Sequence, residues 1–391
     1  MPIDIEQARR DTPGADRILH FNNAGAALPP QQVLAAQRRH LQLEADIGPY
    51  EAAATENDRL EAVYESAARL LNADRTEIAL VENATVAWDM AFYAIGFAPG
   101  DRILTAEAEY ASNYIAFLQI ARRTGAVIDV VPSDATGELD VAALERRIDP
   151  RVKLIAITHV PTNGGLVNPA AAVGRIARAH GILYLLDACQ SVGQMPIDVA
   201  AIGCDLLSAT GRKFLRAPRG TGFLYVRRAV LDQLEPPFLD LRSATWVAPD
   251  RYEMRPDARR FENWERNVAA LLGLGAAVDY ALGLGLSDIA DRIQTLADAL
   301  RIRLAAIPGV TVRDLGQKPC GIVTFTAAGT PARDLVAALR QQRINTHASA
   351  PASTLLDATA RGLPDLVRAS VHYYNTEQEV ARFAAAVAAL V

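Results

Sequence analysis

A lysine amine is the scarcest reactive group in this sequence of 391 residues. Lysine occurs only at positions 153, 213 and 318, and the rest of the 40 basic residues are arginine. Lys213 stands between a predicted strand and the loop PRGTG, whereas Lys153 begins a strand and Lys318 lies in a QKP turn. An amine can form a Schiff base with an aldehyde, and the neighbouring Arg212 guanidinium would help keep it neutral and nucleophilic near pH 7. Lys213 is therefore the candidate catalytic residue.

Polar residues follow several predicted strands at the point where each strand ends. Asp187 follows ILYLL and Thr210 follows DLLSA, and ligands of open α/β sheets bind beyond the carboxyl ends of the strands. An acid at the position of Asp187 can keep a pyridinium nitrogen protonated, which makes the ring an electron sink. Ala84 and Thr85 stand at the start of a predicted helix, where free N–H groups bind anions. These groups together suit a pyridine aldehyde that carries a phosphate.

Phosphate binding needs more than a helix end, because a helix N-terminus contributes only about 0.3 to 2 kcal/mol. We therefore expect Thr210 and Arg212 to bind the phosphate as well. Tyr110, which follows the predicted strand RILTAE, is placed to stack on a ring. Cys189 and Cys204 lie at strand edges and are interpreted as small buried hydrophobic residues.

The elements that position these residues alternate between short β-branched runs and helical stretches from about residue 77. This alternation predicts an α/β fold with a mainly parallel, seven-stranded sheet that is covered on both faces. The runs LIAI and ILYLL are apolar without alternation, which is typical of strands buried on both sides. The predicted strands are EIALVE, RILTAE, AVIDVV, KLIAITHV, ILYLLDA, DLLSAT and TGFLYV.

The second half of the chain follows a different pattern. Residues 231–260 are rich in Pro, Arg and Asp and are expected to form an irregular crossing. A smaller α+β domain is predicted after it, with helices at 265–283, 288–306 and 331–342, a strand at 321–326 and a final helix from 376. We expect a large domain at residues 15–255 and a small domain that combines residues 1–14 with 256–391.

Composition and charge exclude several classes of function. The chain is 50% hydrophobic and 22% charged, with a formal charge of −5, which favours a soluble globular protein without a footprint for nucleic acid or an anionic membrane. It has no run of about 18 apolar residues, and its start MPIDIEQARR lacks an apolar signal segment. Three widely spaced cysteines fit neither a disulfide framework nor a zinc site. We expect a cytoplasmic protein without a bound metal.

Seven motifs occur in the order found in the class V aminotransferase and cysteine desulfurase family of fold type I pyridoxal phosphate (PLP) enzymes, which the chain resembles over nearly its whole length. The resemblance implies the fold of PLP-dependent transferases, PLP as cofactor, an amino acid as substrate and a homodimer with the active site at its interface. The motifs are HFNNAGAALP (20–29), ENAT (82–85), AEYASN (108–113), THVPTNGGLVNP (158–169), DACQSVGQMPIDV (187–199), TGRK (210–213) and RASVHYYNTEQEV (368–380).

The resemblance also implies roles for single residues around the ring. Lys213 would form the Schiff base, Asp187 would contact the ring nitrogen, and Gln190 would contact the phenolic oxygen. Tyr110 takes the place of the family's ring-stacking histidine. Thr162, with Asn163 one place later, lies where a family asparagine approaches the phenolic oxygen.

The resemblance also implies which residues bind the phosphate and the substrate. Ala84 and Thr85 belong to the segment that resembles the phosphate loop, and Thr210 and Arg212 replace the Ser and His of the family's Ser-Gly-His-Lys. Arg368 would grip the substrate carboxylate. Asn22 and Asn23 lie in the segment that resembles the N-terminal lining of the active site.

Two departures from the family's pattern bear on the reaction. Desulfurases carry a nucleophilic cysteine on a loop before the final arginine motif, but no cysteine follows Cys320, and the loop NTHASAPAST has Ser349 and Ser353. The family's Gly-Thr, which reaches the phosphate from the partner subunit, is replaced by Trp264 and Glu265. A desulfurase-like frame without that cysteine predicts a β-lyase of the C–S lyase type. A class V aminotransferase, an amino acid epimerase of the same family and a non-catalytic PLP-binding protein are the alternatives.

Overall fold

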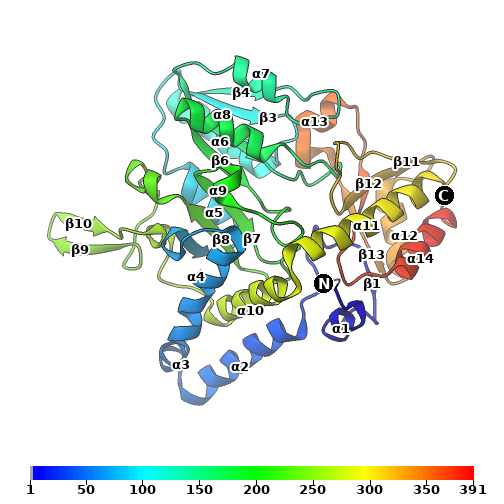
Figure 1. Cartoon of the computed structure of the whole chain (residues 1–391), viewed down its shortest axis with the longest axis horizontal. Coiled ribbons are helices and arrows are strands. Elements are labelled where there is room, and N and C mark those ends of the chain that lie inside the picture. The colour runs from blue at the N-terminus through cyan, green and yellow to red at the C-terminus, as the bar shows by residue number, and fades with distance from the viewer. Residues whose placement is uncertain (1–2) are drawn as a thin grey trace.

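A seven-stranded sheet forms the centre of the molecule (Figure 1), for which a computed structural model describes residues 3–391. Its strand order is β2-β8-β7-β6-β5-β3-β4. The five strands from β7 to β4 pair in parallel, whereas β8 runs antiparallel to both of its neighbours. The predicted, mainly parallel sheet is thus confirmed. Its strands are β2 (Ile78–Val81), β3 (Arg102–Ala106), β4 (Val127–Val131), β5 (Val152–Thr158), β6 (Leu183–Asp187), β7 (Leu206–Thr210) and β8 (Gly222–Val226).

Helices flank this sheet and also form most of the periphery (Figure 1). Most of those that follow residue 80 match predicted helical stretches to within a few residues at most ends, but the short helices at 199–202 and 355–360 and all helices before residue 80 were not predicted. They are α1 (Ile5–Arg10), α2 (Gln31–Ile47), α3 (Pro49–Thr55), α4 (Asn57–Leu71), α5 (Ala84–Phe92), α6 (Ala111–Thr124), α7 (Val141–Arg146), α8 (Ala170–His180), α9 (Val199–Ile202), α10 (Val268–Leu284), α11 (Leu286–Ala305), α12 (Ala332–Gln341), α13 (Leu355–Ala360) and α14 (Glu377–Ala388).

The alternation of side chains along each central strand divides the apolar residues between two cores. In β5, Leu154 and Ala156 belong to the core that is shared with α5 and α6. Ile155 and Ile157 belong to the core on the opposite face, which is shared with α4, α8 and α10. Because successive side chains of a strand point to opposite faces, the unbroken apolar run LIAI packs against helices on both sides.

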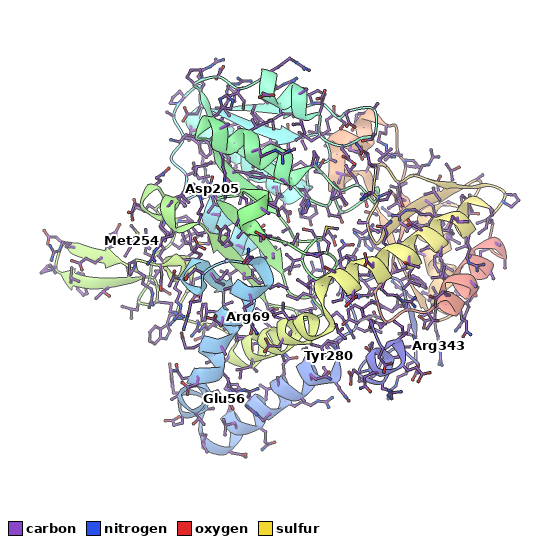
Figure 2. The ribbon with its side chains drawn as sticks, viewed as in Figure 1. Glu56, Arg69, Asp205, Met254, Tyr280 and Arg343 are labelled. Atoms are coloured by element: carbon purple, nitrogen blue, oxygen red, sulfur yellow. The ribbon has the colours of Figure 1, made fainter. Side chains whose placement is uncertain are left out.

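A four-stranded antiparallel sheet of order β11-β12-β15-β14 forms the smaller unit, with α11, α12 and α14 near it (Figure 1). The N-terminal strand β1 pairs in parallel with β13, so the two ends of the chain meet here. The hydroxyl of Tyr280, on α10 (Figure 2), donates to Asp11 at 2.9 Å and ties the N-terminal segment to the long helix. The strands are β1 (Leu19–His20), β11 (Val310–Val312), β12 (Ile322–Ala327), β13 (Ile344–Asn345), β14 (His347–Ser349) and β15 (Leu366–Ser370).

The segment 231–260 contains a hairpin, so the prediction of an irregular crossing was wrong for part of it. Strands β9 (Ala244–Ala248) and β10 (Arg251–Met254) pair antiparallel and project away from the central sheet (Figures 1 and 2). Most of their residues are exposed. A strand pair that packs against no core carries no apolar alternation, which is why the sequence pattern missed it.

Within residues 3–391, no single helix is long and apolar enough to cross a membrane. Helices α10 and α11 meet that test of length and composition only as a pair, and the chain bends by 80° between them.

Candidate active site

The carboxyl ends of β6 and β7 and the N-terminal ends of α5 and α6 border one cavity of about 470 Å³. Residues from four of the sequence motifs meet there, which is the juxtaposition expected at one edge of a parallel sheet. The predicted residues that line the cavity are Ala84, Thr85, Tyr110, Asp187, Thr210, Arg212 and Lys213, and the further lining residues are Glu82, Asn83, Val86, Asn113, Cys189, Arg219 and Gly220.

Lys213 lies in this cavity on the loop that follows β7, and its side chain is buried. Burial lowers the pKa of its amine, and the nearby charges of Arg212 and Arg368 act in the same direction, whereas Cys189 and Asp187 raise it. The direction agrees with the prediction that Arg212 helps to keep the amine neutral. A neutral amine is the nucleophilic form that bonds to an aldehyde.

Asp187 ends β6, and each of its carboxylate oxygens accepts one hydrogen bond within the protein. Oδ1 accepts from the main-chain N–H of Cys189 at 2.8 Å, and Oδ2 accepts from Asn113 Nδ2 at 3.0 Å. Burial raises the pKa of Asp187, whereas the two hydrogen bonds and Lys213 lower it. An ionised carboxylate has further lone pairs, so Asp187 can also accept from a protonated ring nitrogen in the cavity.

The start of α5 supplies the candidate anion site. Asn83 caps the helix by accepting from Val86 N at 3.0 Å, which leaves the N–H groups of Ala84 and Thr85 without a helical acceptor. Strand β8 passes close by, because a Cβ on Gly222 would lie 2.8 Å from the Asn83 carbonyl carbon. Only glycine fits there, so Gly222 allows the helix start to approach the sheet.

Two arginines line the same cavity, and they differ in how their side chains are used. Arg212 donates to the carbonyl of Gly25 and holds the N-terminal segment against the site. Arg219, which the sequence reasoning missed, is exposed at the cavity and makes no ion pair in the part of the chain that the structure describes. The sequence feature that could have identified Arg219 is its position in the segment PRG, which follows the loop that carries Lys213.

Tyr110 is the N-cap residue of α6, and its main-chain N–H donates to the carboxylate of Glu109 at 2.8 Å. The same carboxylate accepts from Asn113 Nδ2 at 2.9 Å. Glu109 and Asn113 were not predicted as site residues. Both lie in the motif AEYASN, with Glu109 just before the N-cap residue Tyr110 and Asn113 in the first turn of α6.

The guanidinium of Arg368, on β15, lies against the loop that carries Thr162. Its NH1 group donates to the hydroxyl of Thr162 at 2.6 Å and to the Thr162 carbonyl at 3.2 Å. Gln190 Nε2 lies 3.5 Å from the same hydroxyl and 3.2 Å from the carbonyl of Ala24. His347 pairs directly with Arg368 across β14 and β15. Burial lowers the pKa of Arg368 to about 10.

The two predicted asparagines of the N-terminal segment are used differently. The Asn23 amide donates to Ser370 O at 2.7 Å and accepts from the Tyr374 hydroxyl at 2.6 Å, so it fastens this segment to β15. Asn22 Oδ1, in contrast, is buried without a hydrogen-bond partner among residues 3–391. Asn163 donates to Thr354 Oγ1 at 3.4 Å. Of the two N-terminal asparagines, Asn22 is therefore the one whose side-chain oxygen has no partner in the described chain, and neither residue lines the cavity at the ends of β6 and β7.

Unpartnered polar atoms mark the part of the site around Arg368. Buried polar atoms normally find partners, but Asn22 Oδ1, Asn163 Oδ1, Gln190 Oε1 and Arg368 Nε have none in the described chain. These atoms, with the lysine, the strand-end acid and the helix start, form a donor and acceptor set that fits PLP and an amino acid carboxylate. Lys213 would hold the aldehyde, Asp187 the ring nitrogen, and Ala84, Thr85, Thr210 and the arginines the phosphate.

The cysteines and the serine loop lie in different places relative to the cavity. Cys189 lines it beside the Lys213 amine, so its interpretation as a mere packing residue was incomplete. Cys320 is buried elsewhere, near Arg301. Ser349 is buried in β14, and Ser353 lies in the short 3₁₀ turn that follows.

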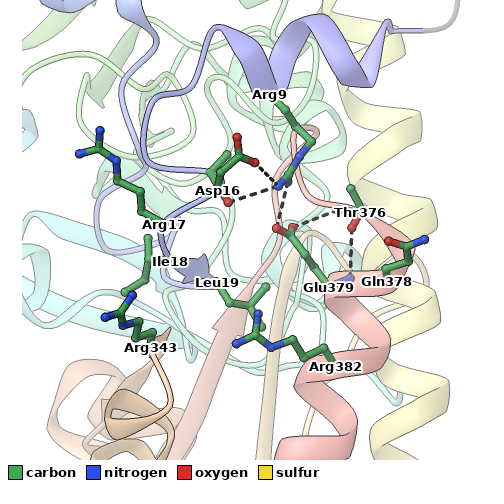
Figure 3. A pocket seen from close by; sticks show the side chains of 11 residues that line it. Arg9, Asp16, Arg17, Ile18, Leu19, Arg343, Thr376, Gln378, Glu379 and Arg382 are labelled. Carbon is green, nitrogen blue, oxygen red and sulfur yellow. Dashed lines mark hydrogen bonds and ion pairs between the residues drawn. The ribbon is translucent and has the colours of Figure 1, made fainter.

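A second cavity, of about 530 Å³, lies between α1, the β1–β13 pair and α14 (Figure 3). Arg9 crosses it and pairs with Asp16 at 3.1 Å and with Glu379 at 2.9 Å. None of the predicted site residues lines this cavity. Among residues 3–391, no group of three or more His, Cys, Asp or Glu side chains is arranged to hold a metal ion.

Comparison with known proteins places this chain among enzymes of related architecture. The sequence profile of the Aminotransferase class-V family matches residues 18–383. A probable cysteine desulfurase of Methanothermobacter thermautotrophicus is 30% identical over 383 residues, covering 96% of this chain and 95% of that protein. One of Xylella fastidiosa (strain 9a5c) is 34% identical over 402 residues, covering 98% and 94%.

Solved structures agree over nearly the whole chain. The apo cysteine desulfurase of Thermococcus onnurineus superposes with a TM-score of 0.91 at 27% identity, covering 100% of this chain and 98% of that one. The cystine C-S lyase C-DES, in complex with its product cysteine persulfide, superposes with a TM-score of 0.87 at 25% identity, covering 96% and 99%. A mutant of C-DES with glycine covalently linked to the PLP cofactor gives a TM-score of 0.88 at 25% identity, covering 97% and 98%.

Proposed function

The chain belongs to the class V aminotransferase family of PLP-dependent enzymes with fold type I, and from that premise we propose that it is a β-lyase acting on a sulfur-bearing amino acid. The observation that carries the proposal is the loop before Arg368, where Ser349 and Ser353 stand and no cysteine follows Cys320. Sulfur would then leave as a free thiol-type product by α,β-elimination. The likeness to the cystine C-S lyase C-DES supports this reaction class.

The cofactor, when bound, supplies an electron sink for the charge that develops at the substrate α-carbon. Asp187 would accept a hydrogen bond from the protonated ring nitrogen and so keep that nitrogen charged, and because Asp187 is buried, this interaction would be strong. Lys213 Nζ removes the α-proton, for which its lowered pKa makes the neutral base available. Tyr110 and Gln190 contact the ring in this assignment.

Arg368 orients the substrate through its α-carboxylate. The unpartnered Nε gives the guanidinium a free donor beside the donors of its outer nitrogens, and a guanidinium edge binds a carboxylate through two parallel hydrogen bonds. Thr162 holds the same guanidinium from the side. This arrangement fixes the α-carbon relative to Lys213.

We also propose that the enzyme is a homodimer with the active site at its interface. Large apolar side chains on the β9–β10 hairpin and in the segment that precedes it support this, because Phe238, Leu241 and Trp246 are 71–76% exposed. An isolated two-stranded hairpin is marginally stable in water, and clustered exposed apolar groups mark contact surfaces. A second copy of the chain that covers the hairpin would stabilise it and would bury these apolar side chains.

The products of an S-substituted cysteine or of cystine test the proposed reaction. We expect pyruvate and ammonia in equal amounts, with the cofactor spectrum unchanged after turnover. Keto acid without ammonia, together with conversion of the cofactor to its amine form, would reject the lyase in favour of an aminotransferase. Exchange of the α-hydrogen with solvent without either product would indicate an epimerase, and no response to any amino acid would indicate a non-catalytic PLP-binding protein.

A further inference from the structure

A second buried carboxylate lies behind Asp187 and has no part in the mechanism described so far. Glu109 is 3% exposed and Asp187 is 5% exposed. One amide joins them, because Asn113 Nδ2 donates to Glu109 Oε1 at 2.9 Å and to Asp187 Oδ2 at 3.0 Å. Both hydrogens of that NH₂ group are thus directed at carboxylates, which determines how the amide is oriented.

Glu109 accepts hydrogen bonds from three different elements. Thr105 Oγ1, on β3, donates to Oε2 at 3.1 Å. Thr158, at the end of β5, donates to Oε2 from its main-chain N–H at 3.0 Å and to Oε1 from its hydroxyl. With Asn113 and the N–H of Tyr110 on α6, the carboxylate has five donors. Hydrogen bonds from such donors favour the ionised form of a carboxylate and so act against the effect of its burial.

The charge of Glu109 has no cationic partner among the residues that the structure describes. Glu262, another fully buried carboxylate, contacts Arg242 at 2.9 Å, as buried charges usually do. Glu109 makes no ion pair with any residue of the described chain, and the charged group that faces it is Asp187, from β6. Burial and the Asp187 charge raise the pKa of Glu109 to about 7, although the hydrogen bonds from Thr158, Asn113 and the Tyr110 main chain lower it.

We propose that Glu109 is a positioning residue of the cofactor site. It holds the Asn113 amide toward Asp187 and the Tyr110 main chain at the start of α6, so that the two residues assigned to the ring are located by one carboxylate. Its negative charge, one amide away from Asp187, also favours the proton on the ring nitrogen. The inference rests on the proposed PLP site.

The charges around the pair determine the direction of the effect. Asp187 faces Glu109, Lys213 faces Asp187 from the cavity, and β3 and β5 contribute only threonines. Removal of the Glu109 charge therefore takes one negative charge from the neighbourhood of a ring cation. The cofactor should lose its protons at a lower pH as a result.

The test compares holoenzymes of the native chain, Glu109→Gln, Asn113→Ala and the control Glu107→Gln. Glu107 lies on the same connection, but among residues 3–391 its carboxylate accepts a hydrogen bond only from Ser133 N, at 3.1 Å. Cofactor absorbance is titrated between pH 5 and 9, and cofactor affinity, kcat and KM are measured with the melting temperature of each variant.

We expect Glu109→Gln to move the absorbance titration to lower pH by on the order of one unit, and to lower kcat about 10-fold with a smaller change in KM. Asn113→Ala, which keeps Glu109, should move the titration in the same direction, and a variant that carries both changes should shift by less than the sum of the two single shifts. Glu107→Gln should match the native chain.

An unchanged titration in both Glu109→Gln and Asn113→Ala, in protein that still binds the cofactor, would overturn the positioning role. A shift in Glu109→Gln that adds fully to the shift in Asn113→Ala would overturn the route through the amide. If the native chain bound no cofactor, the proposed function would fail instead, so the two failures are distinguishable.

Discussion

Two parts of the active site differ in how their buried polar groups are satisfied. At the ring end, formed by Asp187, Asn113 and Glu109, each carboxylate oxygen has a partner within the protein. At the substrate end, around Arg368 and Asn22, several buried polar atoms lack hydrogen-bond partners in the described part of the chain. The difference indicates that the ring end is organised before a ligand binds, whereas the substrate end has unpartnered donors and acceptors that can bind one. Changes at the ring end should therefore lower kcat, and changes at the substrate end should raise KM.

The largest expected effect is at the lysine that both ends share. Lys213→Ala should remove the yellow colour of the bound cofactor and abolish turnover, because neither Lys153 nor Lys318 lines the cavity. Absorbance spectra and product assays measure both. Colour and activity retained in this variant would mean that another amine does the chemistry.

Asp187→Ala breaks the ring end itself. We expect kcat to fall on the order of 100-fold, the scale seen when a preorganised electrostatic partner is removed, with KM changed less. Steady-state kinetics of the cofactor-saturated variant measure this. Near-normal turnover would show that the ring end does not depend on its acid.

The ring end also shows which site residues could be predicted from the sequence. Asp187, Thr210 and Lys213 were predictable, because parallel strands place their final residues at one edge. Glu109 was not, because its role depends on Thr158, a residue that only the folded sheet brings beside it.

The fold likewise contains elements that could be predicted from the sequence and elements that were missed. Buried central strands can be predicted from their apolar runs, whereas the exposed β9–β10 hairpin has no such pattern. Helices α2 to α4 were not predicted, although in α4 the buried Leu60, Val63 and Ala67 recur at helical spacing. The domain boundary at residue 255 stays a prediction.

Arg368→Lys probes the substrate end. The charge is kept but the two-point grip is lost, so we expect KM for the amino acid to rise about 10-fold while kcat changes less. Decarboxylated amines serve as the control, because they lack the group that the guanidinium binds. If the native enzyme were equally active on amino acids and on their decarboxylated amines, Arg368 would not be the residue that binds the substrate carboxylate.

The pH dependence of stability tests the ring end without any substrate. The pKa of Glu109 in the folded protein, about 7, lies above its ordinary value of 4.5, so the unfolded chain releases this proton first as pH rises. The free energy of unfolding should therefore decrease between about pH 4.5 and 7, and Glu109→Gln should flatten that decrease. Urea titrations of cofactor-free protein at several pH values measure it, and an equal slope in both proteins would contradict the assignment.

The smallest expected effect concerns sulfur chemistry away from both ends. Cys320 is buried outside the cavity, so Cys320→Ala should leave kcat and KM within about 2-fold of the native values, although it removes buried volume and lowers the melting temperature somewhat. The ratio of pyruvate to ammonia should stay at one. Lost turnover in folded protein would implicate this thiol in sulfur transfer and reject simple elimination.

The central claim is that one cavity, at the ends of β6 and β7, holds the cofactor through Lys213. Borohydride reduction of the holoenzyme, followed by peptide mapping, tests it directly by fixing the cofactor to the amine that binds it. We predict that the label lies on the peptide containing Lys213 and on no other lysine. A label on Lys153 or Lys318, or no stable label in protein that has bound PLP, would contradict the account.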